Sequence, residues 1–109
     1  EELDLSLRLA RAGWESWYLA DVSAFHRGGG ASGSDVAARL FYGARSRLLY
    51  ARKHFARPTA AALVLAGLLC EPALRLLAAL LRGDGAALRA TARGYTLLWR
   101  DLPRILRSG

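Results

Sequence analysis

The sequence contains no methionine, one cysteine and three prolines, and Lys53 is its only lysine. A single cysteine excludes a disulfide framework and a metal site built from several thiolates. Because the chain starts at Glu1 with neither a methionine nor a signal-peptide pattern, we expect it to be processed or cut from a longer protein. Its 109 residues allow one domain at most, and a hydrophobic content of 53% excludes a disordered charged tail.

Acidic residues are few, and they gather near the start of the chain. Residues 1–26 contain two arginines and five carboxylates, a net charge of −3, whereas residues 27–109 contain fourteen basic groups and four carboxylates, a net charge of +10. A basic body rich in arginine, leucine and alanine favours helices that approach an anionic surface, whether phospholipid, nucleotide or nucleic acid.

The first third of the chain carries signals for one helix and two short strands. Its first leucines alternate as in a strand, but strong helix formers and a suitable C-terminal glycine, Gly13, favour a helix over residues 1–12. The aromatic-rich residues 14–19 and the residues 22–26 predict strands. The glycines and serines of residues 28–33 predict a mobile loop.

A long basic helix is expected next, over residues 35–57. Ser34 is suited to cap its start, and Pro58 prevents its continuation. Apolar residues recur every three or four positions along it, and arginines cover much of the remaining surface.

The most apolar part of the chain follows this helix. Residues 60–70 are uncharged, but this run is shorter than the roughly 20 residues that a membrane span needs. We predict two short helices that meet at Glu71-Pro72, either buried against each other or lying in a bilayer interface. Asp84 is then suited to cap a last helix over residues 85–106, which Gly94 and Pro103 are expected to bend or fray.

Several motifs occur in an order found in one enzyme family. Glu1-Glu2-Leu3-Asp4-Leu5 is followed by Arg8, by Gly13-Trp14, and later by Phe25-His26 and the glycine-rich loop. This order resembles the carboxy-terminal part of the catalytic domain of family 2 inverting glycosyltransferases, especially the bacterial rhamnosyltransferase-like group. Residues 45–54 look like that group's Arg-Asn-Arg segment, so the resemblance extends over about residues 1–57.

The resemblance implies a mainly α fold with a short β portion. Residues 1–33 would form the C-terminal edge of an α/β GT-A domain, the nucleotide-diphospho-sugar transferase fold, and residues 34–109 a basic amphipathic helical region. The activity implied is transfer of a sugar, with inversion, from a nucleotide-sugar donor to a cell-envelope glycan or a lipid-linked acceptor. The protein would be cytoplasmic and peripheral to the inner face of the cell membrane.

Roles for individual residues follow from the same resemblance. Glu2, in place of the family's usual Asp, corresponds to the catalytic base, with Glu1 and Asp4 beside it. His26 corresponds to a position that helps to bind a divalent cation, Mg²⁺ or Mn²⁺, held mostly by an amino-terminal half that is missing here. The residues expected to contact substrates are Arg8, Trp14, Gly28, Gly29, Arg45 and Arg47.

Each of these assignments competes with a simpler interpretation. Carboxylates in a first helical turn are common because they complement the helix dipole, and an isolated histidine is more often a surface residue than a ligand. Trp14, Trp17 and Tyr18 fit strand packing as well as stacking on a sugar. The sequence contains no Asp-x-Asp motif, so we expect no transferase activity from the isolated chain.

Two other functions remain open at this point. One is a membrane-surface or helix-partner module with no chemistry. The other is nucleic-acid binding, which is disfavoured because the basic residues lie on helices with wide apolar faces and no recognised binding motif is present.

Overall fold

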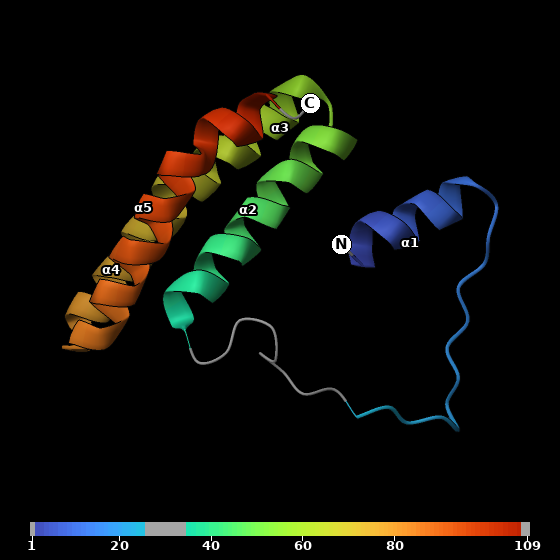
Figure 1. Ribbon diagram of the computed structural model, residues 1–109, viewed down its shortest axis with the longest axis horizontal. Helices are drawn as coiled ribbons and strands as arrows, with labels where there is room; N and C mark the ends of the chain where they lie inside the picture. The colour runs from blue at the N-terminus through green and yellow to red at the C-terminus, as the bar shows by residue number, and fades with distance from the viewer. Residues whose placement is uncertain (1, 26–34, 108–109) are drawn as a thin grey trace. The chain divides into compact units, whose positions relative to one another are not determined.

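The computed structural model describes residues 2–25 and 35–107, and its chain divides into two units, residues 1–30 and 31–109 (Figure 1). We describe each unit by itself. The helical segments, in chain order, are α1 (Glu2–Arg11), α2 (Val36–His54), α3 (Arg57–Leu65), the π-helical turn η1 (Ala66–Cys70), α4 (Glu71–Leu81) and α5 (Gly85–Arg107).

Helix α1 of the first unit confirms the predicted helix, and it ends at the predicted glycine. Gly13 has a φ of +83°, a left-handed conformation that glycine adopts without steric cost. The amide of Trp14 donates to the carbonyl of Leu9 at 3.0 Å, and the amide of Gly13 donates to the carbonyl of Ala10 at 3.1 Å. This pair of bonds is a Schellman motif, which satisfies carbonyls that the last helical turn leaves without partners.

Both predicted strands are wrong as far as the structure describes them. Residues 14–19 and 22–25 have no regular structure, while His26, at the end of the second predicted strand, lies outside the described residues. The aromatic side chains are exposed: Trp17 is 81% accessible, Tyr18 91% and Phe25 94%. Aromatic residues favour strands only where a neighbouring strand and a buried face are present, and this short unit supplies neither among its described residues.

This result overturns the predicted fold class. Residues 2–25 and 35–107 contain helices and irregular segments but no strand, so no α/β GT-A domain is present in the described chain.

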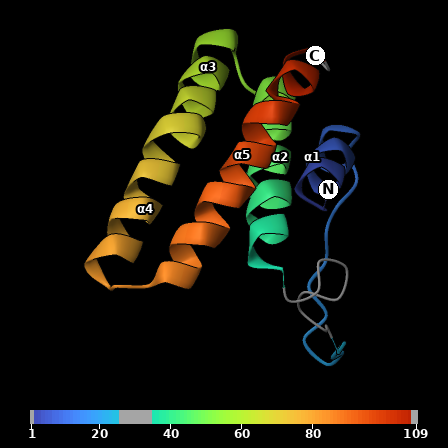
Figure 2. The ribbon, with the colours of Figure 1, turned by 60° about the vertical axis from the view of Figure 1, so that its left-hand side comes forward.

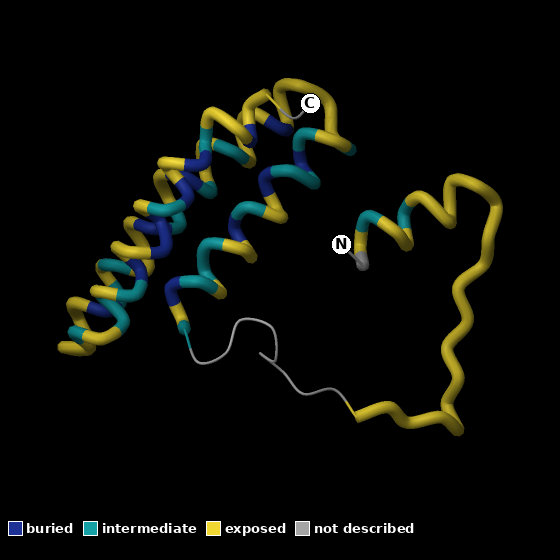
Figure 3. Tube along the Cα trace, viewed as in Figure 1, coloured by how far each residue is buried: buried dark blue, intermediate teal, exposed yellow. Residues whose placement is uncertain are grey.

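Three long helical stretches form the second unit: α2, the stretch from α3 through η1 to α4, and α5 (Figure 2). Each of the three contacts the other two, and Figure 3 shows buried positions along all three. The core consists of Ala44, Leu48, Leu68, Tyr95, Leu98 and Ile105.

Aspartates cap two of these helices. Asp35 accepts hydrogen bonds from the amides of Ala37 (2.9 Å) and Ala38 (3.2 Å), so it caps α2 in the place predicted for Ser34, which lies outside the described residues. The predicted cap at Asp84 is confirmed, because its carboxylate accepts from the amide of Ala87 at 2.9 Å.

The prediction of two short helices meeting at Glu71-Pro72 is wrong. The chain is helical without a break over 25 residues, Arg57–Leu81, and we call this stretch the long helix. Proline lacks an amide hydrogen, so a helix that contains it leaves a carbonyl one turn earlier without its donor. The wider π turn directly before Glu71 accommodates Pro72, and the indole Nε1 of Trp99 donates to the carbonyl of Leu68 at 3.4 Å.

Gly94 allows α5 to approach α2 closely, which explains the glycine better than the predicted bend. A Cβ atom built at Gly94 would lie 2.9 Å from the carbonyl oxygen of Ala37 and 3.1 Å from the Cβ of Leu40. The backbone carbonyl cannot move without disturbing the first turn of α2.

We predict that Gly94→Ala destabilises the second unit by about 1–3 kcal/mol, since overpacking at a rigid contact outweighs the better helix propensity of alanine. Gly43→Ala is the matched control. Gly43 is also inside a helix, but a Cβ there meets nothing within 4 Å, so we expect a gain of about 0.5–1 kcal/mol. Urea unfolding followed by circular dichroism measures both changes. Equal stability of the two variants would contradict the close approach.

Candidate functional site

Only part of the predicted site falls within the described residues. Glu1, His26, Gly28 and Gly29 lie outside them, as does the side chain of Glu2, although Glu2 begins α1. Over residues 2–25 and 35–107 no group of three His, Cys, Asp or Glu side chains is arranged to hold a metal ion.

Three predicted site residues can be placed in the first unit. Asp4 and Arg8 lie one turn apart on α1 and form an ion pair at 3.9 Å between Oδ2 and Nη1. Trp14 follows the helix and is exposed. Residues 2–5 of the acidic motif therefore lie on a helix, with the predicted arginine beside the carboxylate of Asp4.

Arg45 and Arg47, predicted to bind substrate, bind carboxylates of their own unit. The Nε of Arg45 lies 2.6 Å from the Oδ2 of Asp101, whose Oδ1 lies 3.3 Å from the Nη1 of Arg104. The Nη2 of Arg47 lies 2.6 Å from the Oε2 of Glu71. In this structure both arginines join α2 to the other helices.

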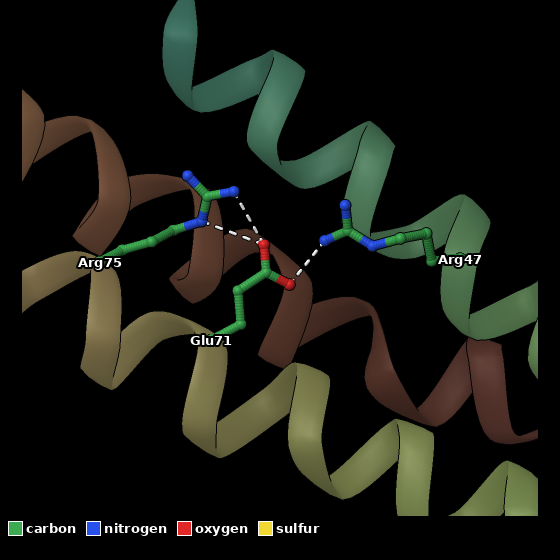
Figure 4. A network of polar contacts seen from close by, with 3 residues as sticks. All are labelled: Arg47, Glu71 and Arg75. Carbon is green, nitrogen blue, oxygen red and sulfur yellow. Dashed lines mark hydrogen bonds and ion pairs between the residues drawn. The ribbon is translucent and has the colours of Figure 1, made fainter.

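Glu71 is the centre of a three-residue ion-pair network (Figure 4). Its Oε2 accepts from Arg47, and its Oε1 accepts from both Nε (3.0 Å) and Nη2 (2.9 Å) of Arg75. Arg47 comes from α2, whereas Glu71 and Arg75 belong to α4, so the Arg47–Glu71 pair links the long helix to α2.

Sequence reasoning missed the partners Glu71 and Asp101. The signal was present, because Glu71 is the only carboxylate between Asp35 and Asp84 and has an arginine four residues later. A lone carboxylate in a basic, apolar region needs a cationic partner if it is to be even partly buried.

The ion pairs of Glu71 and Asp101 change the pKa values of these carboxyl groups and of a neighbouring tyrosine. Burial alone would raise the pKa of Glu71, but the hydrogen bond from Arg75 and the charge of Arg47 outweigh it, so the pKa lies below its ordinary value. Burial raises the pKa of the Tyr95 hydroxyl, and the nearby charge of Glu71 raises it further. The hydrogen bond from Arg45 lowers the pKa of Asp101, with a further contribution from Arg104. Both carboxylates are therefore held in the charged form at neutral pH.

The other side of the long helix is exposed and almost entirely apolar. Only 17% of its most apolar window is buried in the protein. Its exposed leucines, which we call the apolar face, are Leu63, Leu65, Leu69, Leu74, Leu77, Leu80 and Leu81. From residue 60 to residue 81 the only exposed charged side chain is Arg75, which is 44% accessible and already bound to Glu71.

The apolar face is large for a surface exposed to water. At 1.5 Å per residue the long helix extends for about 37 Å, and in length and composition it is sufficient to cross a membrane. Exposed apolar surfaces of this extent mark contacts with membranes or other proteins. We therefore take the apolar face, bordered by arginines at both ends, as the candidate functional site.

Comparison of the sequence and structure with protein-family models, curated proteins and solved structures finds no match.

The ion pairs predict how stability depends on pH. Because the pKa values of Glu71 and Asp101 are lower in the folded state, the unfolded chain binds more protons in this range. Their contribution to the free energy of unfolding is complete above the ordinary carboxyl pKa values, about 3.9–4.3, and is lost as the pH falls towards the lowered values.

We predict that Glu71→Gln lowers the urea midpoint of the second unit at pH 7. It should also reduce the loss of unfolding free energy between about pH 5 and about pH 3, roughly the range in which these carboxyl groups titrate. Glu15→Gln, which changes an exposed side chain of the first unit, is the charge-matched control and should leave both quantities unchanged. The network would have no structural role if Glu71→Gln behaved like this control.

Proposed function

We propose that the second unit binds to the surface of an anionic membrane, with the apolar face inserted among the lipid headgroups and upper acyl chains. The observation that carries this proposal is the unbroken long helix, whose exposed side bears leucines and whose inner side holds the charged network.

Simple energetics support membrane binding. Moving a half-exposed leucine out of water contributes about 1 kcal/mol, so the seven leucines of the apolar face together supply several kcal/mol. Basic residues near an anionic lipid surface add roughly 1 kcal/mol each. Arg57 at the start of the long helix and Arg82 just after its end are placed to contribute in this way, with their aliphatic stems along apolar surface.

An orientation parallel to the membrane fits the packing better than a spanning one. Glu71 lies near the middle of the long helix, so a spanning helix would carry the Arg47–Glu71–Arg75 network to the bilayer centre. Each charged side chain there costs about 2.5–3.5 kcal/mol on insertion scales. The basic helices α2 and α5 pack along the long helix and would have to follow it. Lying parallel, the long helix keeps these charges on the protein side and the leucines on the lipid side.

We predict that Leu77→Asp removes most of the binding to vesicles of phosphatidylglycerol and phosphatidylcholine in a sedimentation assay. Leu77 is exposed on the apolar face, so the substitution should not unfold the unit. Ser46→Asp, at an exposed position of α2, adds the same charge away from the apolar face and should retain binding. Equal binding by the two variants, or no binding by the unchanged chain at low salt, would exclude the proposal.

A second candidate function, glycosyl transfer, is favoured by the acidic motif on α1. Residues 2–5 of the motif lie on α1, Gly13 follows the end of this helix, and Asp4 is paired with Arg8, in the order of the family that the sequence resembles. As catalytic base, Glu2 would take the proton from an acceptor hydroxyl. The oxygen of that hydroxyl would attack the anomeric carbon while the nucleotide diphosphate leaves from the opposite face. A lipid-linked acceptor would suit a chain that is held at a membrane.

This function would need donor-binding residues beyond this chain. The resemblance also implies Mg²⁺ or Mn²⁺, but the described residues offer no cluster of metal ligands, and no step of the proposal passes through the ion.

We predict that Glu2→Gln, made in a longer protein that contains this chain, lowers the rate of sugar transfer by about 100-fold or more, the range that a positioned general base contributes. The control Glu15→Gln should leave the rate unchanged. Transfer from a nucleotide-sugar donor to a lipid-linked acceptor at an undiminished rate would show that Glu2 is not the base.

A further inference from the structure

A groove opens at the end of the second unit where α2 and α5 begin and α4 ends. Its volume is about 380 Å³, within the range of about 300–1,000 Å³ that is typical of small-molecule sites. Its apolar walls come from Val36 and Leu40 of α2, Leu74 and Ala78 of α4, and Ala87 of α5.

Two arginines line this groove and give it a positive charge. Arg82 makes no ion pair within the described residues. Arg75 uses Nε and Nη2 to bind Glu71, and Figure 4 shows its other terminal nitrogen on the side away from that carboxylate. Because Arg47 also binds Glu71, the network as a whole keeps one positive charge.

The carboxylates near the groove, Asp35 and Asp84, bind the first turns of helices, and neither lines the groove. Asp84 caps α5, and Asp35 caps α2 and lies 3.6 Å from Arg93. The amino-terminal ends of α2 and α5 lie at the groove, but their capping aspartates offset the helix dipoles, so the positive charge of the groove comes from its arginines. The ligand that matches these walls has an apolar part and an anionic head.

The groove is continuous with the apolar face. Leu74 lines the groove and is also 65% exposed on the apolar face. A molecule lying in the membrane beside the long helix thus has an apolar route into the groove. This continuity favours a lipid over a water-soluble anion.

We infer that this groove binds one anionic phospholipid, with an acyl chain against Leu40, Leu74 and Ala78 and the phosphate between Arg75 and Arg82. The inference rests on the proposed membrane binding for the source of the lipid. It adds headgroup selectivity, since a guanidinium binds a phosphate by charge-assisted hydrogen bonds and a choline headgroup offsets the charge of that phosphate.

Monomeric lipids test the groove separately from the membrane. The chain is titrated with dihexanoyl phosphatidylglycerol below its micelle concentration, with phosphatidylcholine of the same chain length, and with inorganic phosphate, while backbone amide resonances are followed by NMR. We expect saturable shifts at Leu40, Ala78 and Ala87 with the anionic lipid. The affinity for phosphatidylcholine should be lower than that for phosphatidylglycerol by about fivefold or more. Equal affinity for the two lipids, or tighter binding of inorganic phosphate, would overturn the inference.

Variants locate the site on the groove. Arg82→Gln should weaken binding of the anionic monomer by about fivefold, the effect of one basic group near a lipid phosphate, and Ala78→Phe should block the apolar part. Arg100→Gln removes the same charge from an exposed position of α5 outside the groove and should leave affinity unchanged. The inference fails if Arg82→Gln and Arg100→Gln have equal effects.

The two proposals have separable outcomes. Leu77→Asp should remove most of the vesicle binding while leaving binding of the lipid monomer intact, because Leu77 does not line the groove. If vesicles bind but the monomer produces no saturable shifts, the groove inference is wrong and the membrane proposal stands. If the monomer binds but vesicles do not, the membrane proposal is wrong and the groove still binds an anionic lipid.

Discussion

The ion pair of Glu71 with Arg47 joins the long helix to α2, and together with the buried Leu68 it holds one side of that helix against the rest of the unit. Glu71 is the only carboxylate between Arg57 and Leu81, so no other residue of that helix offers the arginines of α2 an acidic partner. With the inner side held by this pair and by the buried Leu68, the leucines of the apolar face have no protein to cover them. The apolar face is therefore the part of the long helix that neither the ion pair nor the core uses.

Much of the fold was predictable from local signals. The Schellman motif at Gly13 and the cap at Asp84 depend on residues within one or two turns, and both predictions are confirmed. The interruption predicted at Glu71-Pro72 is wrong because a π turn directly before these residues keeps the helix continuous, and because the donor to the carbonyl of Leu68 is Trp99, 31 residues away. The strands failed for a similar reason, since aromatic residues form strands only when a distant segment supplies a partner.

The candidate site was predictable only in part. The basic amphipathic character of the helix predicted over residues 35–57 was evident, but Arg45 and Arg47 proved to be bound to Asp101 and Glu71. Arg47 and its partner are 24 positions apart, and Arg45 and its partner are 56 positions apart. Helical periodicity predicts contacts only between neighbours on one helix, so it could not identify these pairs. The extent of the apolar face could not be predicted either, because it depends on the helix remaining continuous through Pro72.

The central claim is that the long helix lies parallel to a membrane surface with its leucines in the lipid. The single cysteine, Cys70, is exposed near the middle of this helix and provides a site for an environment-sensitive fluorophore. Ala61→Cys and Leu81→Cys, each combined with Cys70→Ser, place the same label near the two ends. Quenching by lipids that carry quenchers at known depths should locate all three labels at one shallow depth in anionic vesicles. A label at position 70 in the bilayer centre with those at 61 and 81 near opposite surfaces, or three labels that remain in water, would contradict the account.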